Sequence, residues 1–167
     1  MTLALVNKLL KRRLHEQDCH KVDFTPLPVG NRRVLIITIA FNNDAVLRHQ
    51  ILHMRENCRD VDMEYVVADN SPTVERQNAI KAVCDEFGVG YINLPKSPKI
   101  NKISGSYSHG AAAMWLYYNY VIKRNPYCFG FIDHDLFPIR PFSIIEKLFG
   151  TLNTTKSLYF SFFNLSI

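Results

Sequence analysis

The sequence lacks any uninterrupted apolar run of about 18 residues, the length that a membrane-spanning helix requires. It also lacks a CxxC pair, and it contains no internal repeat and no low-complexity tract. We therefore expect one ordinary globular domain in which the dispersed cysteines are reduced and mostly buried. These cysteines are Cys19, Cys58, Cys84 and Cys128.

Two nucleotide-binding signatures are missing as well. The absence of a GxGxxG stretch weakens the case for a dinucleotide-dependent dehydrogenase. A nucleotidyltransferase of similar architecture needs a glycine-rich, basic loop after its first strand, and the corresponding stretch AFNNDAV has neither glycine nor lysine. The net charge of +5 suits an anionic partner. Because no RNA-reading aromatic motif accompanies this charge, we expect no nucleic-acid ligand.

The chain is expected to divide at residue 32. Residues 1–32 comprise an amphipathic helix over 2–16 and all but the last residue of a linker, VDFTPLPVGNRR, which ends at Arg33. The helix either packs on its own domain or makes a peripheral contact with a membrane surface. Its basic residues follow a very short apolar stretch, the reverse of a signal peptide, so we expect a cytoplasmic location. The apolar stripe contains Leu3, Val6, Leu10 and Leu14, and the basic residues are Lys8, Lys11, Arg12 and Arg13.

Residues 33–167 alternate between expected strands and helices. Apolar, β-branched runs predict buried strands over 34–40, 64–68, 89–94 and 127–132, and a last strand over 157–163. Helical spacing predicts helices from Asn43 or Asp44, from Ser71-Pro72 to Gly88, from about Ser108, and over 142–149. This alternation predicts an α/β fold, a three-layer sandwich on a mainly parallel sheet.

Polar residues follow three of these strands. In open sheets of this kind, ligands bind outside the carboxyl ends of the strands. The polar stretches are Phe41-Asn42, Asp69-Asn70 and Asp133-His134-Asp135. Three such stretches at one edge indicate a site more strongly than a single strand-terminal aspartate, which is commonly a helix cap.

Asp133 and Asp135 would point to the same side if the strand continued through both residues. Two carboxylates about 5 Å apart would repel by roughly 3 kcal/mol at an effective dielectric of about 20. Positive charge is therefore expected nearby. Oxygen ligands of this kind suit Mg²⁺ or Mn²⁺, which would leave positions open for phosphate oxygens. His134 would point away from the two aspartates.

Other residues fit a phosphate-binding role. Asp69 is a candidate acceptor of a hydrogen bond from a base or ribose. Ser108 and His109 open a helix, whose first N–H groups favour anions; the alternative is that Ser108 is a plain helix cap. The basic loop that contains Lys96, Lys99 and Lys102 either helps to bind phosphates or is simply solvated.

These stretches together resemble the GT-A glycosyltransferases, especially the family 2-like enzymes. The resemblance covers about residues 33–142. Ala40-Phe41-Asn42 corresponds to the family's "TYN"-like stretch and Ala68-Asp69-Asn70-Ser71 to its base-binding "VDDGS"-like stretch. Asp133-His134-Asp135 corresponds to the DXD motif, which binds the metal and the sugar-nucleotide phosphates. The resemblance implies a nucleotide-sugar site formed by Ala40, Phe41, Asn42, Asp69, Asn70, Ser108, His109, Asp133 and His134, with Mn²⁺ or Mg²⁺ on Asp133 and Asp135.

The sequence departs from the family in two places. SHGAAAMW stands where the family has an "ARN"-like stretch, and Glu146 is the only acid after Asp135. The family's acceptor-binding half, which supplies the catalytic base, is therefore expected to be absent or much reduced. We expect a glycosyltransferase with an unknown acceptor and an unknown base, or a non-catalytic nucleotide-sugar-binding module that needs a partner chain.

Overall fold

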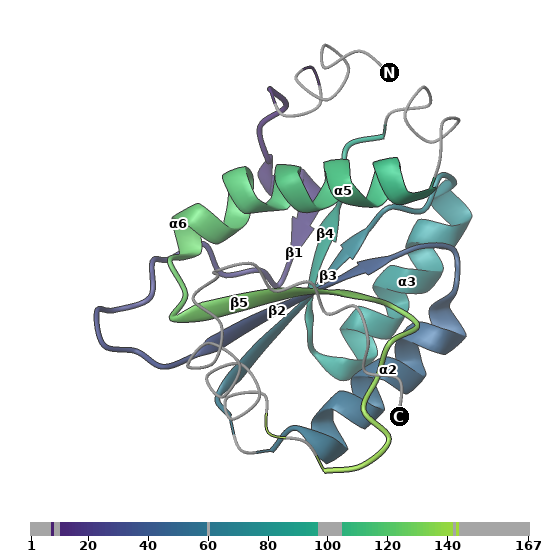
Figure 1. The fold of residues 1–167 in the computed structure, drawn as a ribbon. Coiled ribbons are helices and arrows are strands. Elements are labelled where there is room, and N and C mark those ends of the chain that lie inside the picture. The colour runs from purple at the N-terminus through teal and green to yellow at the C-terminus, as the bar shows by residue number, and fades with distance from the viewer. Residues whose placement is uncertain (1–7, 9–10, 60, 97–104, 142, 144–167) are drawn as a thin grey trace.

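The computed structural model describes residues 8, 11–59, 61–96, 105–141 and 143. Its five strands form one sheet in the order β1-β4-β3-β2-β5 (Figure 1). The strands β2, β3, β4 and β5 run parallel to one another, and β1 pairs antiparallel to β4. Their bounds are Cys19–His20 (β1), Val34–Ala40 (β2), Met63–Asp69 (β3), Gly90–Asn93 (β4) and Cys128–Asp133 (β5).

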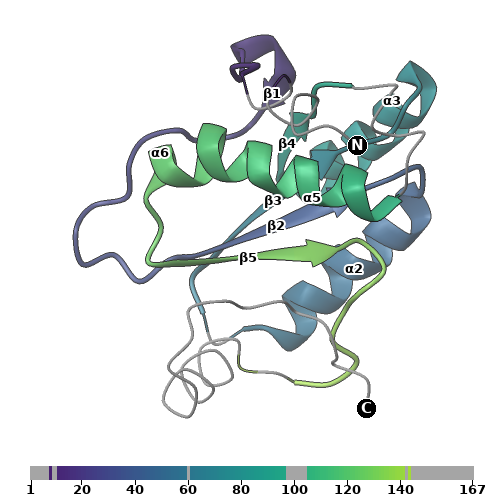
Figure 2. The same cartoon turned by 45° about the horizontal axis from the view of Figure 1, so that its top comes forward.

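Helices cover both faces of the sheet, which gives the expected three layers (Figures 1 and 2). Helices α2 (Asp44–Asn57) and α3 (Val74–Phe87) pack on one face. The other face is covered by one nearly continuous helical segment formed by α5 (Gly105–Leu116), a π-helical turn η2 (Tyr117–Val121) and α6 (Ile122–Arg124). Among the described residues, no helix is both long enough and apolar enough to cross a bilayer.

The strand β2 lies between β3 and β5 within the sheet, and all seven of its residues are buried. Successive side chains of a strand point to opposite faces. Val34 and Ile36 accordingly pack under α2 and α3, whereas Leu35, Ile37 and Ile39 pack under α5 and η2. This is why the sequence of β2 is apolar at every position except Thr38 instead of alternating.

The four long parallel strands and the helix after β2 confirm the sequence predictions. Asn43 caps α2 by accepting a hydrogen bond from the Val46 amide at 3.1 Å. Gly88 ends α3 with a left-handed φ of 61°. All four cysteines are free thiols, as expected, and Cys58 and Cys84 are buried.

The starts of two helices differ from the predictions. The cap of α3 is Thr73, not Ser71, because the Ser71 amide is engaged in a turn with the Asp69 carboxylate and the helix begins at Val74. The helix expected from Ser108 already begins at Gly105. The helix expected over 142–149 and the strand expected over 157–163 lie outside the described residues.

The N-terminal part of the chain also differs from the prediction. The predicted helix over 2–16 does not continue to its end, because residues 12–15 are not helical and Glu16–Asp18 forms a short 3-10 turn, η1. Sequence patterns also missed β1, which adds an antiparallel strand to the sheet. The stretch 22–33 packs on the domain: Leu27 is buried and its amide donates to the Arg124 carbonyl at 2.9 Å.

Candidate functional site

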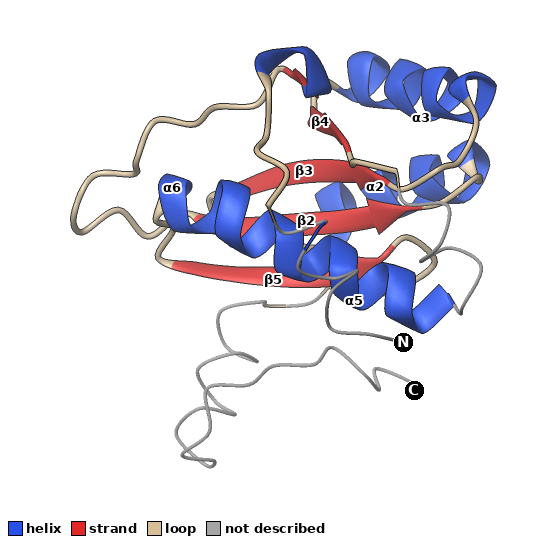
Figure 3. Ribbon diagram, turned by 90° about the horizontal axis from the view of Figure 1, so that it is seen from above, coloured by secondary structure: helices blue, strands red, loops and turns tan. Residues whose placement is uncertain are grey.

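The register of the sheet brings the predicted polar stretches to one edge. Asp69 of β3 is paired with Ala40 of β2, and Asn93 of β4 is paired with Asp69. On the other side of β2, Asp133 is paired with Ile39. The strands β2, β3, β4 and β5 lie side by side in the sheet (Figure 3), and this register brings these residues to one edge. We call this region the carboxyl edge.

Asp69 is the most deeply buried acid at this edge, with no exposed surface. Its Oδ1 accepts a hydrogen bond from the Ser71 amide at 2.7 Å, and its Oδ2 accepts one from the Tyr91 hydroxyl at 2.9 Å. Burial raises the pKa of Tyr91 far above its ordinary value, and the neighbouring Asp69 charge adds to this shift. Both carboxylate oxygens are therefore engaged within the protein, and they hold the 69–71 loop in place.

Further hydrogen bonds join the loops after β2 and β3 to α5. The Asn42 amide donates to the Ser71 hydroxyl at 2.9 Å, and the Asn70 side chain donates to the Ser108 hydroxyl at 2.7 Å. Asn42 has a left-handed φ of 58°, a conformation that asparagine tolerates better than most residues. Phe41, the first residue after β2, is exposed. The first turns of α5 therefore lie at the carboxyl edge beside both loops.

The Asp133–Asp135 stretch lies at the end of β5. The strand ends at Asp133, and the Leu136 amide donates to the Asp133 carbonyl at 3.1 Å in a turn. The expected strand alternation therefore does not extend to Asp135. His109 of α5 supplies the partner of Asp133, with Nδ1 3.0 Å from Oδ1. Both aspartate side chains are exposed, and His134 is half-buried.

The side chain of Gln50 in α2 binds the backbone of this turn. Its side chain has no exposed surface, and its amide nitrogen donates to the carbonyl of Asp133 at 2.6 Å and to that of Leu136. Its carbonyl oxygen accepts from the Thr38 hydroxyl at 2.8 Å and from the Tyr65 hydroxyl at 2.7 Å. The spacing of Leu47, Ile51 and Met54 predicts only an apolar face for this helix. The signal of a further role for Gln50 is its place as a polar residue at a core position of α2.

Two more residues at the carboxyl edge were not predicted from the sequence. Asn93 ends β4, and Arg76 of α3 reaches the Asn42 carbonyl at 3.5 Å. The buried amide oxygens of Asn42 and Asn93 have no hydrogen-bond partner within the described part of the chain. Buried polar atoms without a protein partner are uncommon, and each is ordinarily satisfied by an ordered water or a bound group.

The lysines of the predicted basic loop are only partly described. Lys96 donates from Nζ to the Asp69 carbonyl at 2.9 Å, and burial lowers its pKa. It therefore lies at the carboxyl edge with the other candidates. Lys99 and Lys102 lie outside the described residues.

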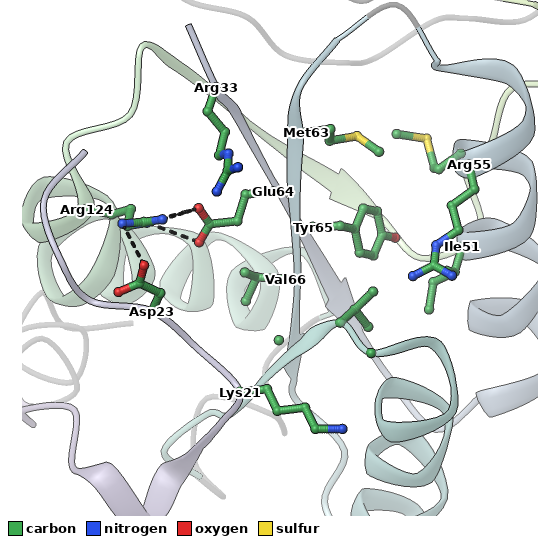
Figure 4. Close-up of a pocket in the computed structure, with 14 residues that line it drawn as sticks. Lys21, Asp23, Arg33, Ile51, Arg55, Met63, Glu64, Tyr65, Val66 and Arg124 are labelled. Carbon is green, nitrogen blue, oxygen red and sulfur yellow. Dashed lines mark hydrogen bonds and ion pairs between the residues drawn. The ribbon is translucent and has the colours of Figure 1, made fainter. Parts of the chain in front are cut away.

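A cavity of about 360 Å³ lies at the opposite edge of the sheet, near the first residues of β3 and β4 (Figure 4). Its charged side chains are already paired with groups of the protein. Arg124 Nη2 lies 2.8 Å from Glu64 Oε2 and its Nη1 lies 3.1 Å from Asp23 Oδ2, while Arg33 pairs with Asp62. These contacts fasten the 22–27 stretch to β3 and α6, so we regard this cluster as structural.

The carboxyl edge offers suitable donors for a hard cation. Asp133 and Asp135 present exposed carboxylate oxygens, the ligand type that Mg²⁺ and Mn²⁺ prefer. No cluster of three or more histidine, cysteine or acidic side chains with metal-binding geometry occurs among the described residues. A cation at this place would therefore depend on phosphate and water oxygens for its other ligands.

Comparison with known proteins adds no family assignment. No protein-family model, no curated protein and no solved structure matches the chain.

Proposed function

We propose that this chain is a metal-dependent glycosyltransferase, or the donor-binding part of one, that uses a nucleotide-diphosphate sugar. The observation that supports this most is the convergence of three polar stretches at the carboxyl edge. The register pairs Asp69 with Ala40 and Asp133 with Ile39, and His109 of α5 contacts Asp133. This is the edge at which open parallel sheets bind nucleotides. The proposal includes a GT-A arrangement of the sheet.

We assign the nucleoside to the part of the edge near β2 and β3. The exposed ring of Phe41 offers a stacking surface, and the side-chain oxygen of Asn42, which has no hydrogen-bond partner among the described residues, offers an acceptor. Asp69 contributes by fixing the 69–71 loop, because its own carboxylate is fully buried and doubly hydrogen-bonded. Ala40 and Asn70 complete this part of the edge: the Asn70 amide donates to the Ala40 carbonyl, and the Asn70 side chain donates to Ser108.

We assign the diphosphate to the part of the edge near β5 and α5. Asp133 and Asp135 would hold Mn²⁺ or Mg²⁺, with Ser108, His109 and His134 around the phosphates. When bound, the divalent cation would offset the negative charge of the diphosphate leaving group. The chain's own contribution is to hold the two carboxylates in place through the Gln50 contacts to the turn and the His109 contact to Asp133.

A second candidate is a nucleotide-sugar-binding module without catalysis, completed by a partner chain. This candidate is favoured by the contacts that the described acids of the carboxyl edge already make. Asp69 is buried and hydrogen-bonded through both oxygens, and Asp133 contacts His109. Transfer to an acceptor needs a group that removes the acceptor proton. None of the residues at the carboxyl edge is assigned that role.

Calorimetry with UDP and GDP, with and without Mn²⁺, tests the proposal. We expect binding that depends on Mn²⁺ and is lost in Asp135→Ala. Asp62→Ala is the matched control, because Asp62 is an exposed aspartate that precedes β3 at the opposite edge. Absence of nucleotide binding by the folded wild-type protein under all four conditions would overturn the proposal.

A donor hydrolysis assay separates the two candidates. Release of UDP or GDP from a panel of nucleotide sugars, above the level seen with Asp135→Ala, would reject the non-catalytic module. Mn²⁺-dependent binding without any hydrolysis or transfer would favour it over the enzyme.

A further inference from the structure

The outward side of α5 and η2, which Ile122 of α6 continues, has an unusual composition. Residues 105–122 contain no Asp, Glu, Lys or Arg, whereas the solvent side of a surface helix is ordinarily charged or polar. Large side chains are exposed instead: Met114 at 45 %, Tyr117 at 39 %, Tyr118 at 54 % and Ile122 at 52 %. Met114, Tyr118 and Ile122 are four residues apart and so share one side of the helix. We call Met114, Tyr117, Tyr118 and Ile122 the aromatic strip.

The strip continues onto the sheet. The ring of Tyr117 lies 5.8 Å from the ring of Phe129 in β5, and Phe129 is itself partly exposed and contacts Phe131 at 5.8 Å. In the described part of the chain, β5 is the outermost strand on its side of the sheet. The exposed apolar surface therefore spans a helix and the adjacent strand, and is larger than isolated surface residues would form.

Exposed basic residues lie close to the aromatic strip. They come from the residue after Ile122 and from the N-terminal stretch that packs beside α5. Lys123 is exposed directly after Ile122. On the N-terminal side, Trp115 donates from Nε1 to the Arg12 carbonyl at 2.7 Å, and the Leu14 amide donates to Asn119 Oδ1 at 3.3 Å. These two bonds fix the 12–14 stretch alongside the helix, and the neighbouring basic side chains are exposed there. They are Lys11, Arg12 and Arg13.

We propose that the aromatic strip and these basic residues form a surface that docks on an anionic lipid bilayer. Tyrosine favours the membrane–water interface, Met114 and Ile122 supply apolar side chains for shallow insertion, and the lysine and arginine residues attract anionic headgroups. A second copy of the chain fits this surface less well. A symmetric contact through it would bring two basic clusters together, and they would repel. The inference does not depend on nucleotide-sugar binding at the carboxyl edge.

Vesicle flotation tests this inference with the full chain. We expect the protein to float with phosphatidylcholine vesicles that contain phosphatidylglycerol, much less with pure phosphatidylcholine, and less as salt is raised. Tyr118→Ser/Ile122→Ser should weaken partition about tenfold, because it removes two exposed apolar groups. Leu52→Ser is the control, since Leu52 is an exposed apolar residue of α2 on the opposite face of the sheet.

Trp115 provides a second measurement, because it is the single tryptophan of the chain and lies in α5 beneath the aromatic strip. Brominated lipids in anionic vesicles should quench its fluorescence in the wild type and not in the double variant. Thermal unfolding and nucleotide binding of each variant check that the fold and the carboxyl edge are intact.

Three results would overturn the inference. The first is an absence of flotation at any lipid composition. The second is equal flotation of the double variant and Leu52→Ser, which would leave only charge attraction through the N-terminal residues. The third is a wild-type dimer in solution that the double variant dissociates, which would make the aromatic strip an interface between two copies.

Discussion

The side-chain amide of Gln50 donates to the carbonyl oxygen of Asp133 at 2.6 Å, although the two residues are 83 positions apart. The same amide nitrogen donates to Leu136, so a fully buried residue of α2 closes the turn that contains Asp133, His134 and Asp135. The hydroxyls of Thr38 and Tyr65 in turn hold the Gln50 carbonyl. The candidate metal ligands are therefore positioned by the core of the protein, through a polar cluster beneath the sheet edge.

Replacing Gln50 should loosen this turn. Gln50→Leu has nearly the same volume but leaves the Asp133 and Leu136 carbonyls without this donor, whereas the Thr38 and Tyr65 hydroxyls can still bond to each other. We expect the free energy of unfolding to fall by about 2–4 kcal/mol, because each unsatisfied buried group costs about 1–3 kcal/mol. Urea denaturation measures this loss. If Gln50 also positions Asp133 and Asp135, Mn²⁺-dependent UDP binding should weaken in protein that is still folded. Unchanged nucleotide affinity would show that the turn does not need this support.

Asn42 permits a separation of backbone conformation from side-chain chemistry. Its φ of 58° costs most residues about 1 kcal/mol, so Asn42→Ala should lower stability by about that amount. Asn42→Gly should keep the loop conformation, because glycine adopts this φ without strain. If the side-chain amide of Asn42 contacts the nucleotide, both variants should bind UDP more weakly by calorimetry. A glycine variant with full affinity would restrict Asn42 to a backbone role.

Arg124 is the centre of the ion-pair cluster at the opposite edge. Arg124→Ala should destabilise the protein by about 3–5 kcal/mol, since it leaves the mostly buried Glu64 carboxylate without its cation. Arg124→Met/Glu64→Leu should be considerably more stable than the single variant, because no unpaired charge stays buried. Thermal and urea unfolding test both expectations. Nucleotide binding at the carboxyl edge should be unaffected in folded Arg124→Met/Glu64→Leu; a loss of binding would indicate a role beyond structure.

Alkaline pH should unfold this protein through its buried phenols and thiols. Burial raises the pKa of Tyr65, Tyr91 and Tyr120, and it raises the pKa of Cys84 to about 12. These groups keep their protons in the folded state when the unfolded chain has already lost them. Their stabilising effect is therefore complete below the ordinary thiol and phenol pKa values and declines as pH rises above about 9 to 10.

Urea unfolding midpoints between pH 7 and pH 11, with tyrosinate absorbance recorded in parallel, measure this decline. Tyr91→Phe should show a shallower decline than the wild type, since one of the titrating groups is gone. A urea midpoint that stays constant, or that increases as the pH is raised beyond 10, would contradict the expectation.

Local sequence determined the elements of this fold. The β-branched run from Val34 to Ala40 favours a strand buried on both faces, and the spacing of Leu47, Ile51 and Met54 favours a helix with one apolar side. These preferences depend on neighbouring residues, so they are legible in the sequence. Parallel order and short connections then place the strand ends, with Ala40, Asp69 and Asp133, at a common edge. That much of the candidate site was predictable.

Tertiary structure decided which partner each of these residues has. Tyr91 meets the buried Asp69 carboxylate, His109 meets Asp133, and Gln50 holds the turn before Asp135, all across long sequence separations. The antiparallel strand β1 and the docking of the 12–14 stretch on Trp115 also depend on surfaces that exist only after the sheet and α5 have packed. Hydrogen bonds of this kind need distance and direction in space, and residue order alone specifies neither.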